Sequence, residues 1–141
     1  MSEPGGIHQR AILDTSALIL IDRIPSVEFL PRTPLITAIS LAELSVGPLV
    51  VKSDLERARR IAHLQRVEAT FSPLPFDVKA ARAFGGVAAS LRRAGRKLSA
   101  RRKDAMIAAI ALSRELPVYT CDAQDFKHID GLDVVLIPVP V

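Results

Sequence analysis

Short apolar runs alternate with helical segments along this chain of 141 residues, and the alternation constrains the fold more than any other feature. The apolar runs, which we interpret as strands, lie at residues 11–13, 35–37, 74–76, 117–120 and 134–137, the third being the weakest. The helical segments are expected at residues 16–23, 39–46 and 54–70, from residue 78 through Leu91 to before Gly95, and at 102–115. Strands that alternate with helices form parallel sheets covered on both faces. The sequence therefore predicts an α/β fold, a three-layer α/β/α domain with a short parallel sheet of four to five strands.

Composition limits the size and the class of the protein. Hydrophobic residues make up 49% and charged residues 24% of the chain, which is the balance of a folded globular protein. We expect a single domain over residues 1–141, with residues 1–10 as a loose leader. Aromatic residues account for only 4%, so the core must be built from aliphatic side chains, and a stacking platform for unpaired bases is disfavoured.

The sequence gives no sign of a membrane or of an oxidising compartment. No apolar run approaches the roughly 20 residues that a membrane-spanning helix needs, and no signal peptide opens the chain. Cys121 is the only cysteine, which excludes an internal disulfide framework and a thiolate-rich zinc site. We therefore expect a cytoplasmic protein with no membrane partner.

The charges are unevenly distributed. Residues 78–103 hold nine basic side chains and no acidic one, whereas residues 104–141 hold six acidic and two basic ones. A basic surface of this kind suits the phosphates of RNA, although it is also typical of a solvated helix end. The residues that we expect to contact RNA are Arg92, Arg93, Arg96, Lys97, Arg101, Arg102 and Lys103.

Several carboxylates stand in apolar surroundings. Asp14 ends the first apolar run, Glu43 lies within the helix after the second, and Asp104 opens the apolar helix that leads to the fourth. Asp122 follows that fourth run, and Asp125 comes three residues later. Sites in open parallel sheets form beyond the carboxyl ends of the strands. If the first and fourth runs are neighbours, these side chains converge on one cleft.

Converging carboxylates repel one another unless a cation neutralises them. Mg²⁺ and Mn²⁺ prefer oxygen ligands, and such an ion beside a basic surface is what a metal-dependent nuclease needs. The neighbouring hydroxyls of Thr15, Ser16 and Thr120 either hold metal-bound waters or a phosphate, or only cap helices. Capping alone also remains a reading of Asp14 and of Asp122.

Four segments in fixed order carry a resemblance to a known family. They are residues 13–18 (LDTSAL), 40–47 (SLAELSVG), 103–109 (KDAMIAA) and 119–126 (YTCDAQDF). In this order the chain resembles the PIN-domain ribonucleases, and specifically the VapC-type toxins of bacterial toxin–antitoxin pairs. Each segment alone is a weak signal, but the ordered set spans nearly the whole chain.

The resemblance implies an endoribonuclease that uses Mg²⁺ or Mn²⁺ to cut single-stranded or structured RNA such as tRNA or rRNA, leaving 5′-phosphate and 3′-hydroxyl ends. It implies Asp14, Glu43, Asp104 and Asp122 as catalytic acids and Asp125 as an auxiliary acid, with Asp14, Asp104, Asp122 and Asp125 as metal ligands. It also implies a homodimer and a VapB-like antitoxin that blocks the cleft.

Two other classes compete with this one: a PIN-like domain that does not cut, and a phosphoryl-accepting fold, either a phosphatase or a receiver domain. A PIN-like domain that binds RNA or a partner without cutting would be expected to have a broken acidic set, whereas here the set is complete. A phosphatase of the haloacid-dehalogenase type needs an acid two residues after its first aspartate, but that position is Ser16. A receiver domain needs a late lysine after a strand, and Lys127 is in the wrong context.

Overall fold

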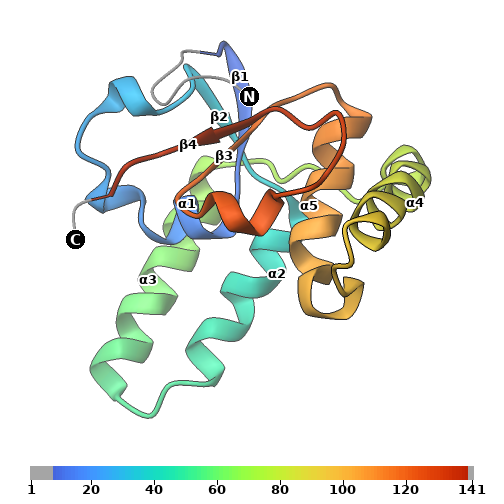
Figure 1. Ribbon diagram of the computed structural model, residues 1–141. Coiled ribbons are helices and arrows are strands. Elements are labelled where there is room, and N and C mark those ends of the chain that lie inside the picture. Colours follow the sequence, from blue (N-terminus) through green and yellow to red (C-terminus); the bar gives the residue numbers. More distant parts are fainter. Residues whose placement is uncertain (1–7, 140–141) are drawn as a thin grey trace.

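The structure, a computed structural model, describes residues 8–139 and has a four-stranded parallel sheet at its centre (Figure 1). The strands are β1 (Arg10–Leu13), β2 (Thr33–Leu35), β3 (Val118–Thr120) and β4 (Val134–Leu136). Their order in the sheet is β2-β1-β3-β4, so β1 and β3, the first and fourth predicted runs, are neighbours. The chain moves outward in opposite directions from this central pair. The carboxyl ends of β1 and β3 therefore form the switch point at which open α/β sheets build their sites.

Helices cover both faces of the sheet. They are α1 (Thr15–Ile19), α2 (Ala38–Val46), α3 (Asp54–Thr70), α4 (Val78–Arg93) and α5 (Arg102–Ser113). Short 3₁₀ turns join them: η1 (Ile21–Arg23), η2 (Val27–Phe29), η3 (Gly47–Leu49), η4 (Leu98–Arg101) and η5 (Ala123–Phe126). In Figure 1, α4 and α5 lie on one side and α2 and α3 project together as a hairpin. Among the described helices, none is long and apolar enough to cross a membrane.

The alternation of side chains along the strands divides the core into two layers. Ile12 and Val118 pack with the buried residues of α4 and α5, whereas Leu13 and Tyr119 face the layer of α1, η1 and η2. Helix α5 is buried along most of its length, including Ile107. The predicted three-layer α/β/α domain with four strands is thus confirmed.

Three predicted elements differ from the structure because of proline. Residues 74–76 do not form a strand; Leu74 makes only an isolated bridge to Thr37, and Pro75 cannot donate to a ladder. Strand β2 lies two residues earlier than predicted. It tolerates Pro34 because it is an edge strand, in which the Thr33 N–H donates to the carbonyl of Gln9 at 2.8 Å.

The predicted helix over residues 16–23 is instead α1 followed by η1. Ile24 is extended, as the residue before Pro25 favours, so the helix cannot continue. Residues 1–7 of the predicted leader lie outside the described residues. Its last part is ordered by contacts, since Arg10 opens β1 and His8 Nδ1 lies 3.0 Å from the Tyr119 hydroxyl oxygen.

Candidate active site

Asp14 lies at the switch point and is 1% exposed. Its Oδ1 accepts hydrogen bonds from the Ala17 N–H at 2.9 Å and from the Ser16 hydroxyl at 2.8 Å. The Thr120 hydroxyl, at the end of β3, donates to Oδ2 at 2.6 Å. Burial raises the pKa of Asp14 to about 6, and these hydrogen bonds oppose the rise. Asp14 therefore caps α1, as the capping interpretation predicts. It also places a buried carboxylate at the carboxyl end of β1.

Glu43 reaches the same region from the middle of α2. The Thr15 hydroxyl donates to its Oε1 at 2.7 Å, and the Ser40 hydroxyl lies 2.8 Å from that of Thr15. Since the single proton of Thr15 is used on Glu43, Ser40 donates to Thr15. On its other oxygen, Glu43 lies 3.9 Å from the Lys103 ammonium. A chain of hydroxyls thus fixes Glu43 to the residue that follows Asp14.

Asp104 stands in the first turn of α5 and is half-buried. Burial is the main cause that raises its pKa to about 7, and the negative charges of Asp125, Asp14 and Glu43 add to the rise. Within residues 8–139, no hydrogen-bond donor is placed on the Asp104 carboxylate. Carboxylates from four separate segments therefore face one region, and Asp104 lies among them without a donor.

Asp122 and Asp125 lie in and before η5. Asp122 is exposed, and its Oδ1 accepts a hydrogen bond from the Gln124 N–H at 3.0 Å, so it caps this turn. Asp125 is half-buried, and its pKa is raised by burial and by the charges of Asp122 and Glu43. Its charge in turn raises the pKa of Asp14 and Asp104. Asp125, expected as an auxiliary acid, is thus closer to the centre of the acidic region than Asp122.

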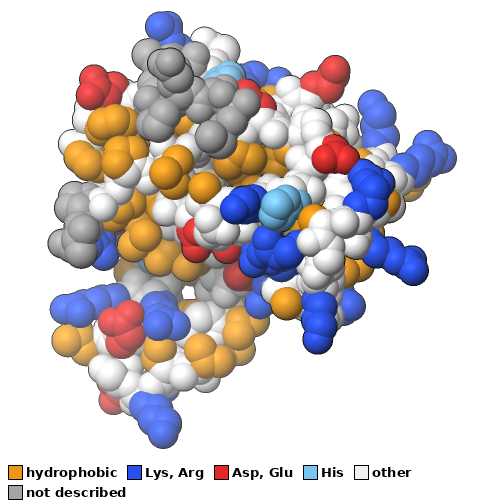
Figure 2. Space-filling model, in the orientation of Figure 1, with side chains coloured by type: hydrophobic (Ala, Val, Ile, Leu, Met, Phe, Trp, Pro, Cys, Tyr) orange, Lys and Arg blue, Asp and Glu red, His pale blue; other side chains and the backbone are white. Residues whose placement is uncertain are grey.

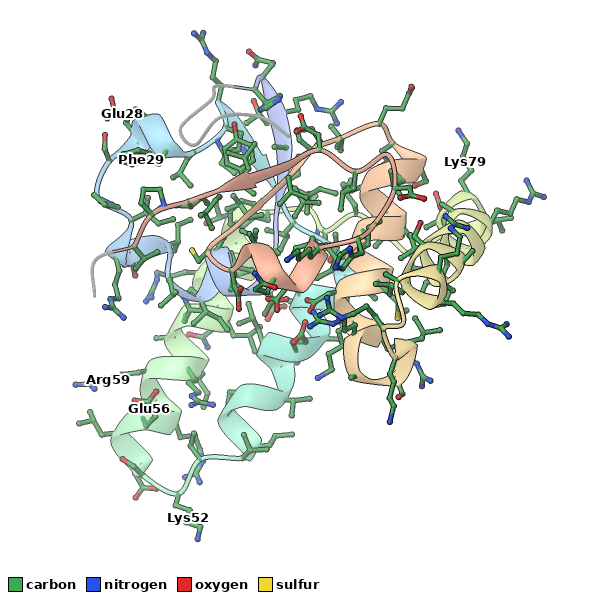
Figure 3. The ribbon with its side chains drawn as sticks, viewed as in Figure 1. Glu28, Phe29, Lys52, Glu56, Arg59 and Lys79 are labelled. Carbon is green, nitrogen blue, oxygen red and sulfur yellow. The ribbon has the colours of Figure 1, made fainter. Side chains whose placement is uncertain are left out.

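These residues form the acidic site, which we define as Asp14, Glu43, Asp104, Asp122 and Asp125. Figure 3 shows oxygen atoms gathered between α1, α2, α5 and η5, where the site lies. All of its charged ligands are carboxylates, the donor type that Mg²⁺ and Mn²⁺ prefer. In the described part of the chain, no three Asp, Glu, His or Cys side chains are close enough to enclose an ion. The residue types fit such a cation, although the carboxylates are not drawn together around one point.

The predicted RNA-binding residues do not share one environment. Figure 2 shows Lys and Arg side chains gathered on the side of α4 and the start of α5. Arg92, Lys97 and Arg102 are exposed there, whereas Arg93 pairs with Asp130. Two of the set, Lys103 and Arg101, lie at the acidic site itself, and Arg96 is half-buried. The sequence alone could not distinguish the exposed residues from those at the acidic site, because the chain turns through η4 before α5 begins.

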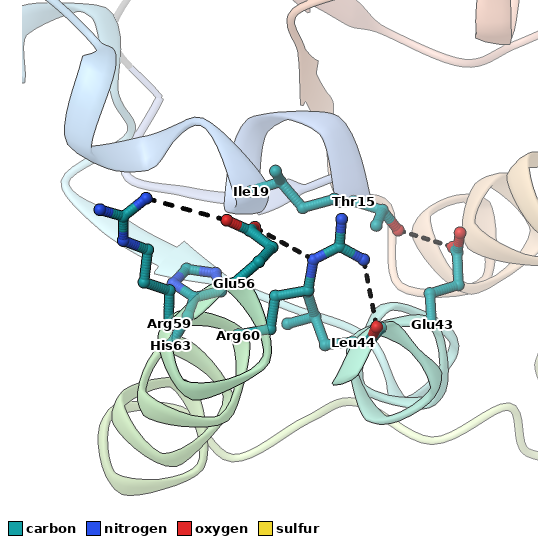
Figure 4. A pocket seen from close by; sticks show the side chains of 9 residues that line it. Thr15, Ile19, Glu43, Leu44, Glu56, Arg59, Arg60 and His63 are labelled. Carbon is teal, nitrogen blue, oxygen red and sulfur yellow. Dashed lines mark hydrogen bonds and ion pairs between the residues drawn. The ribbon is translucent and has the colours of Figure 1, made fainter. Parts of the chain in front are cut away.

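A cavity of about 440 Å³ adjoins the acidic site between α1, α2 and α3 (Figure 4). Thr15 and Glu43 border it on the side of the acidic site, and Ile19 and Leu44 give it apolar walls. The remaining lining residues are Gly47, Glu56, Arg59, Arg60 and His63. Sequence reasoning missed this cavity, because its walls come from three helices whose packing no local pattern reveals.

A comparison with family models now places the chain. The model of the PIN domain matches residues 11–132. The chain belongs to the PIN-domain family.

Relatives within the family are named as ribonucleases. Ribonuclease VapC5 of Mycobacterium tuberculosis is 38% identical over 122 residues, which are 85% of this chain and 87% of that protein. Ribonuclease VapC of Rickettsia bellii is 29% identical over 104 residues, or 74% and 76% of the two chains.

Solved structures agree with this placement. A member of the VapBC family of toxin–antitoxin systems, VapBC-5 from Mycobacterium tuberculosis, has a TM-score of 0.78 and 35% identity, covering 92% of this chain and 100% of that one. DNA-bound VapBC from Salmonella typhimurium has a TM-score of 0.73 and 27% identity, covering 90% and 97%. The predicted family is therefore confirmed.

Proposed function

We propose that this chain is a VapC-type endoribonuclease that binds Mg²⁺ or Mn²⁺ at its acidic site and hydrolyses RNA. One observation carries the proposal: carboxylates from four segments face one region, where burial, together with their charges, raises the pKa of Asp14 and Asp104. The ribonuclease names of the relatives support the reaction class. We assign metal binding to Asp14, Asp104, Asp122 and Asp125, and a catalytic role to these acids together with Glu43.

The residues of the chain prepare this site in two ways. Hydroxyls of Ser16 and Thr120 orient the Asp14 carboxylate, and the Thr15 hydroxyl orients that of Glu43. Lys103 places a positive charge at the edge of the site, where it can attract an RNA phosphate. A bound divalent ion would offset phosphate charge and activate water for in-line attack.

The proposal is tested by cutting a labelled single-stranded RNA with purified protein in Mg²⁺, in Mn²⁺ and in EDTA. We expect cleavage only with metal, and a loss of at least about 100-fold in Asp104→Asn, because the substitution removes a charge directed at the ion. Asp22→Asn, at an acid whose side chain is 82% exposed, is the matched control and should cut normally. A folded wild-type protein that binds RNA without cutting it would favour the catalytically silent alternative.

We further propose a VapB-like antitoxin as partner, because the structural relatives are VapBC complexes. The cavity beside the acidic site offers apolar walls at Ile19 and Leu44 for an amphipathic helix. The acidic site should attract an Arg or Lys of that partner, since arginine pairs well with carboxylates. Inhibition would then arise from a basic side chain near Asp14, Glu43 and Asp104 that excludes the metal. The expected homodimer stays a prediction.

Purified antitoxin tests this mode of inhibition in excess Mg²⁺. Replacing the inserted basic residue of the antitoxin with Ala should restore part of the nuclease activity while the complex still forms. An antitoxin that inhibits equally well without any basic residue in its C-terminal half would show that it acts by steric cover alone.

A further inference from the structure

We propose that Arg101 is a positioning residue of the acidic site, which ties the turn that carries Asp122 and Asp125 to the helix that carries Asp104. The inference rests on the proposed nuclease function and adds a residue to it. It also separates Arg101 from the exposed arginines with which the sequence grouped it. Arg101 stands at the end of η4, immediately before α5, and its side chain is half-buried.

A single hydrogen bond joins the two acidic segments. The Arg101 Nη1 donates to the carbonyl oxygen of Gln124 at 3.0 Å, across 23 positions of sequence. Within residues 8–139, it is the only hydrogen bond between the η4–α5 segment and η5. Phe126 of η5 is buried among residues of α5, and the bond adds a polar link between the two segments at the point where the acids meet.

The two backbone N–H groups next to this carbonyl, those of Gln124 and Asp125, are also held. The Gln124 N–H donates to Asp122 Oδ1 at 3.0 Å, and the Asp125 N–H donates to the Asp122 carbonyl at 3.2 Å. Gln124 is thus pinned between the Asp122 carboxylate and the Arg101 guanidinium. Releasing the guanidinium would free the turn that orients both carboxylates.

The position of the Arg101 guanidinium charge also supports a positioning role for this residue. Arg101 is the cation whose field acts on both Asp104 and Asp125. It forms no direct ion pair with either, so it lowers their mutual repulsion without occupying their oxygens. A cation in that place can hold the acids together and still leave them free to bind a divalent ion.

Arg102 offers a matched control, because it is the next residue and carries the same charge. Its side chain is exposed and makes no hydrogen bond or ion pair in the described part of the chain. Arg102→Ala should therefore behave as a lost RNA contact, which raises KM and leaves kcat unchanged.

The test compares Arg101→Ala, Arg101→Lys and Arg102→Ala in two measurements. The first is amide hydrogen exchange of residues 122–127 in the metal-free protein. We expect about tenfold faster exchange in Arg101→Ala, the effect of about 1.4 kcal/mol for one lost hydrogen bond. Arg101→Lys keeps the charge but is one bond too short to reach Gln124, so it should exchange nearly as fast. Arg102→Ala should match the wild type.

The second measurement is the kinetics of RNA cleavage. Arg101→Ala and Arg101→Lys should lower kcat by about tenfold or more with KM within about twofold, since a misplaced ligand set slows chemistry rather than binding. Unchanged exchange together with a rise in KM alone would make Arg101 an RNA contact and overturn the proposal. If the wild type cuts no RNA, the nuclease assignment fails while the exchange experiment still decides the role of Arg101.

Discussion

At the scale of single residues, hydroxyl groups decide which carboxylates are fixed and which stay available. Asp14 receives hydrogen bonds from Ser16 and Thr120, and Glu43 receives one from Thr15, whereas Asp104 receives none among the described residues. In Asp104, burial and then the charges of Asp125, Asp14 and Glu43 disfavour the ionised carboxylate, and no hydrogen bond compensates. Its pKa of about 7 lies well above the ordinary value of 3.8 for an aspartate.

The raised pKa of Asp104 predicts how the stability of the metal-free protein depends on pH. The unfolded chain releases this proton near pH 3.8, but the folded chain holds it until about pH 7. The folded state thus binds more protons in this window, and its stability falls as pH rises through it. Asp104→Asn removes this effect. In urea unfolding with EDTA at pH 8, the free energy of unfolding of Asp104→Asn should be about 2 kcal/mol higher than that of the wild type.

The difference between Asp104→Asn and the wild type should shrink as the pH falls toward 4, because the Asp104 side chain of the folded wild type is then neutral. Asp22→Asn should show no such trend. A variant no more stable than the wild type at pH 8 would mean that burial and the neighbouring charges do not raise the pKa of Asp104.

The sequence was sufficient to single out the acids but not their surroundings. Asp14, Glu43 and Asp104 were recognisable because a carboxylate inside an apolar run needs a reason to be there. Asp125 could not be ranked above Asp122, because burial within a short turn depends on packing against α5. The places of Arg101 and Lys103 were also hidden, because their partners, the Gln124 carbonyl and the Glu43 carboxylate, are distant in the sequence.

At the scale of elements, the end of α4 sets the course of the basic segment. Gly95 has a φ of +73°, its N–H donates to the carbonyl of Arg92, and the Arg96 N–H donates to that of Leu91. This pair of bonds is a Schellman motif, which stops the helix and turns the chain toward η4. The turn at Gly95 thereby sets the direction of the chain that leads through η4 to Arg101 and then to Asp104.

Gly95→Ala should destabilise the protein by about 1 kcal/mol, because a side chain is strained at positive φ. Gly86→Ala is the matched control: it lies inside α4 with nothing within 4 Å of the added carbon, and should stabilise by about 0.5 kcal/mol. Chemical denaturation should give a lower free energy of unfolding for Gly95→Ala and a higher one for Gly86→Ala, each compared with the wild type. A neutral Gly95→Ala would argue against the motif as the stop signal.

Most elements could be predicted from the sequence, and the exceptions lie at prolines. Helices α3 and α4 lie where the sequence predicts them, and the side chains of Ser53 and Asp77 cap them. At Pro75 the predicted strand does not form. Pro34 lies in β2, which tolerates it as an edge strand, a position that only the sheet order defines. Edge position is a property of the whole sheet, so no local pattern could supply it.

At the scale of the whole molecule, opposite charges are separated by the fold. The acidic site occupies the switch point of the sheet, and exposed cations lie beside it along the end of α4 and the start of α5 (Figure 2). This arrangement suits a polyanion whose flanking phosphates rest on the cations while one phosphate reaches the acids.

Salt dependence of RNA binding tests this arrangement. Lys97→Gln with Arg102→Gln should weaken binding and flatten the log–log salt slope by up to about 0.7 for each lost contact. Lys52→Gln with Lys79→Gln removes the same charge at the tip of the α2–α3 hairpin and on the outside of α4 (Figure 3), and should leave the slope unchanged. Equal slopes for both pairs would reduce the basic segment to a solvated helix end.

The most direct test of the account is the number of protons released when Mn²⁺ binds, measured by calorimetry in buffers of different ionisation enthalpy. Because Asp104 and Asp14 have pKa values of about 7 and about 6 without metal, binding must displace their protons. We predict release of about one proton or more per bound ion at pH 6 and almost none at pH 8, with Asp104→Asn releasing fewer. Mn²⁺ that does not bind, or binds without releasing protons at pH 6, would contradict the assignment of these carboxylates as its ligands.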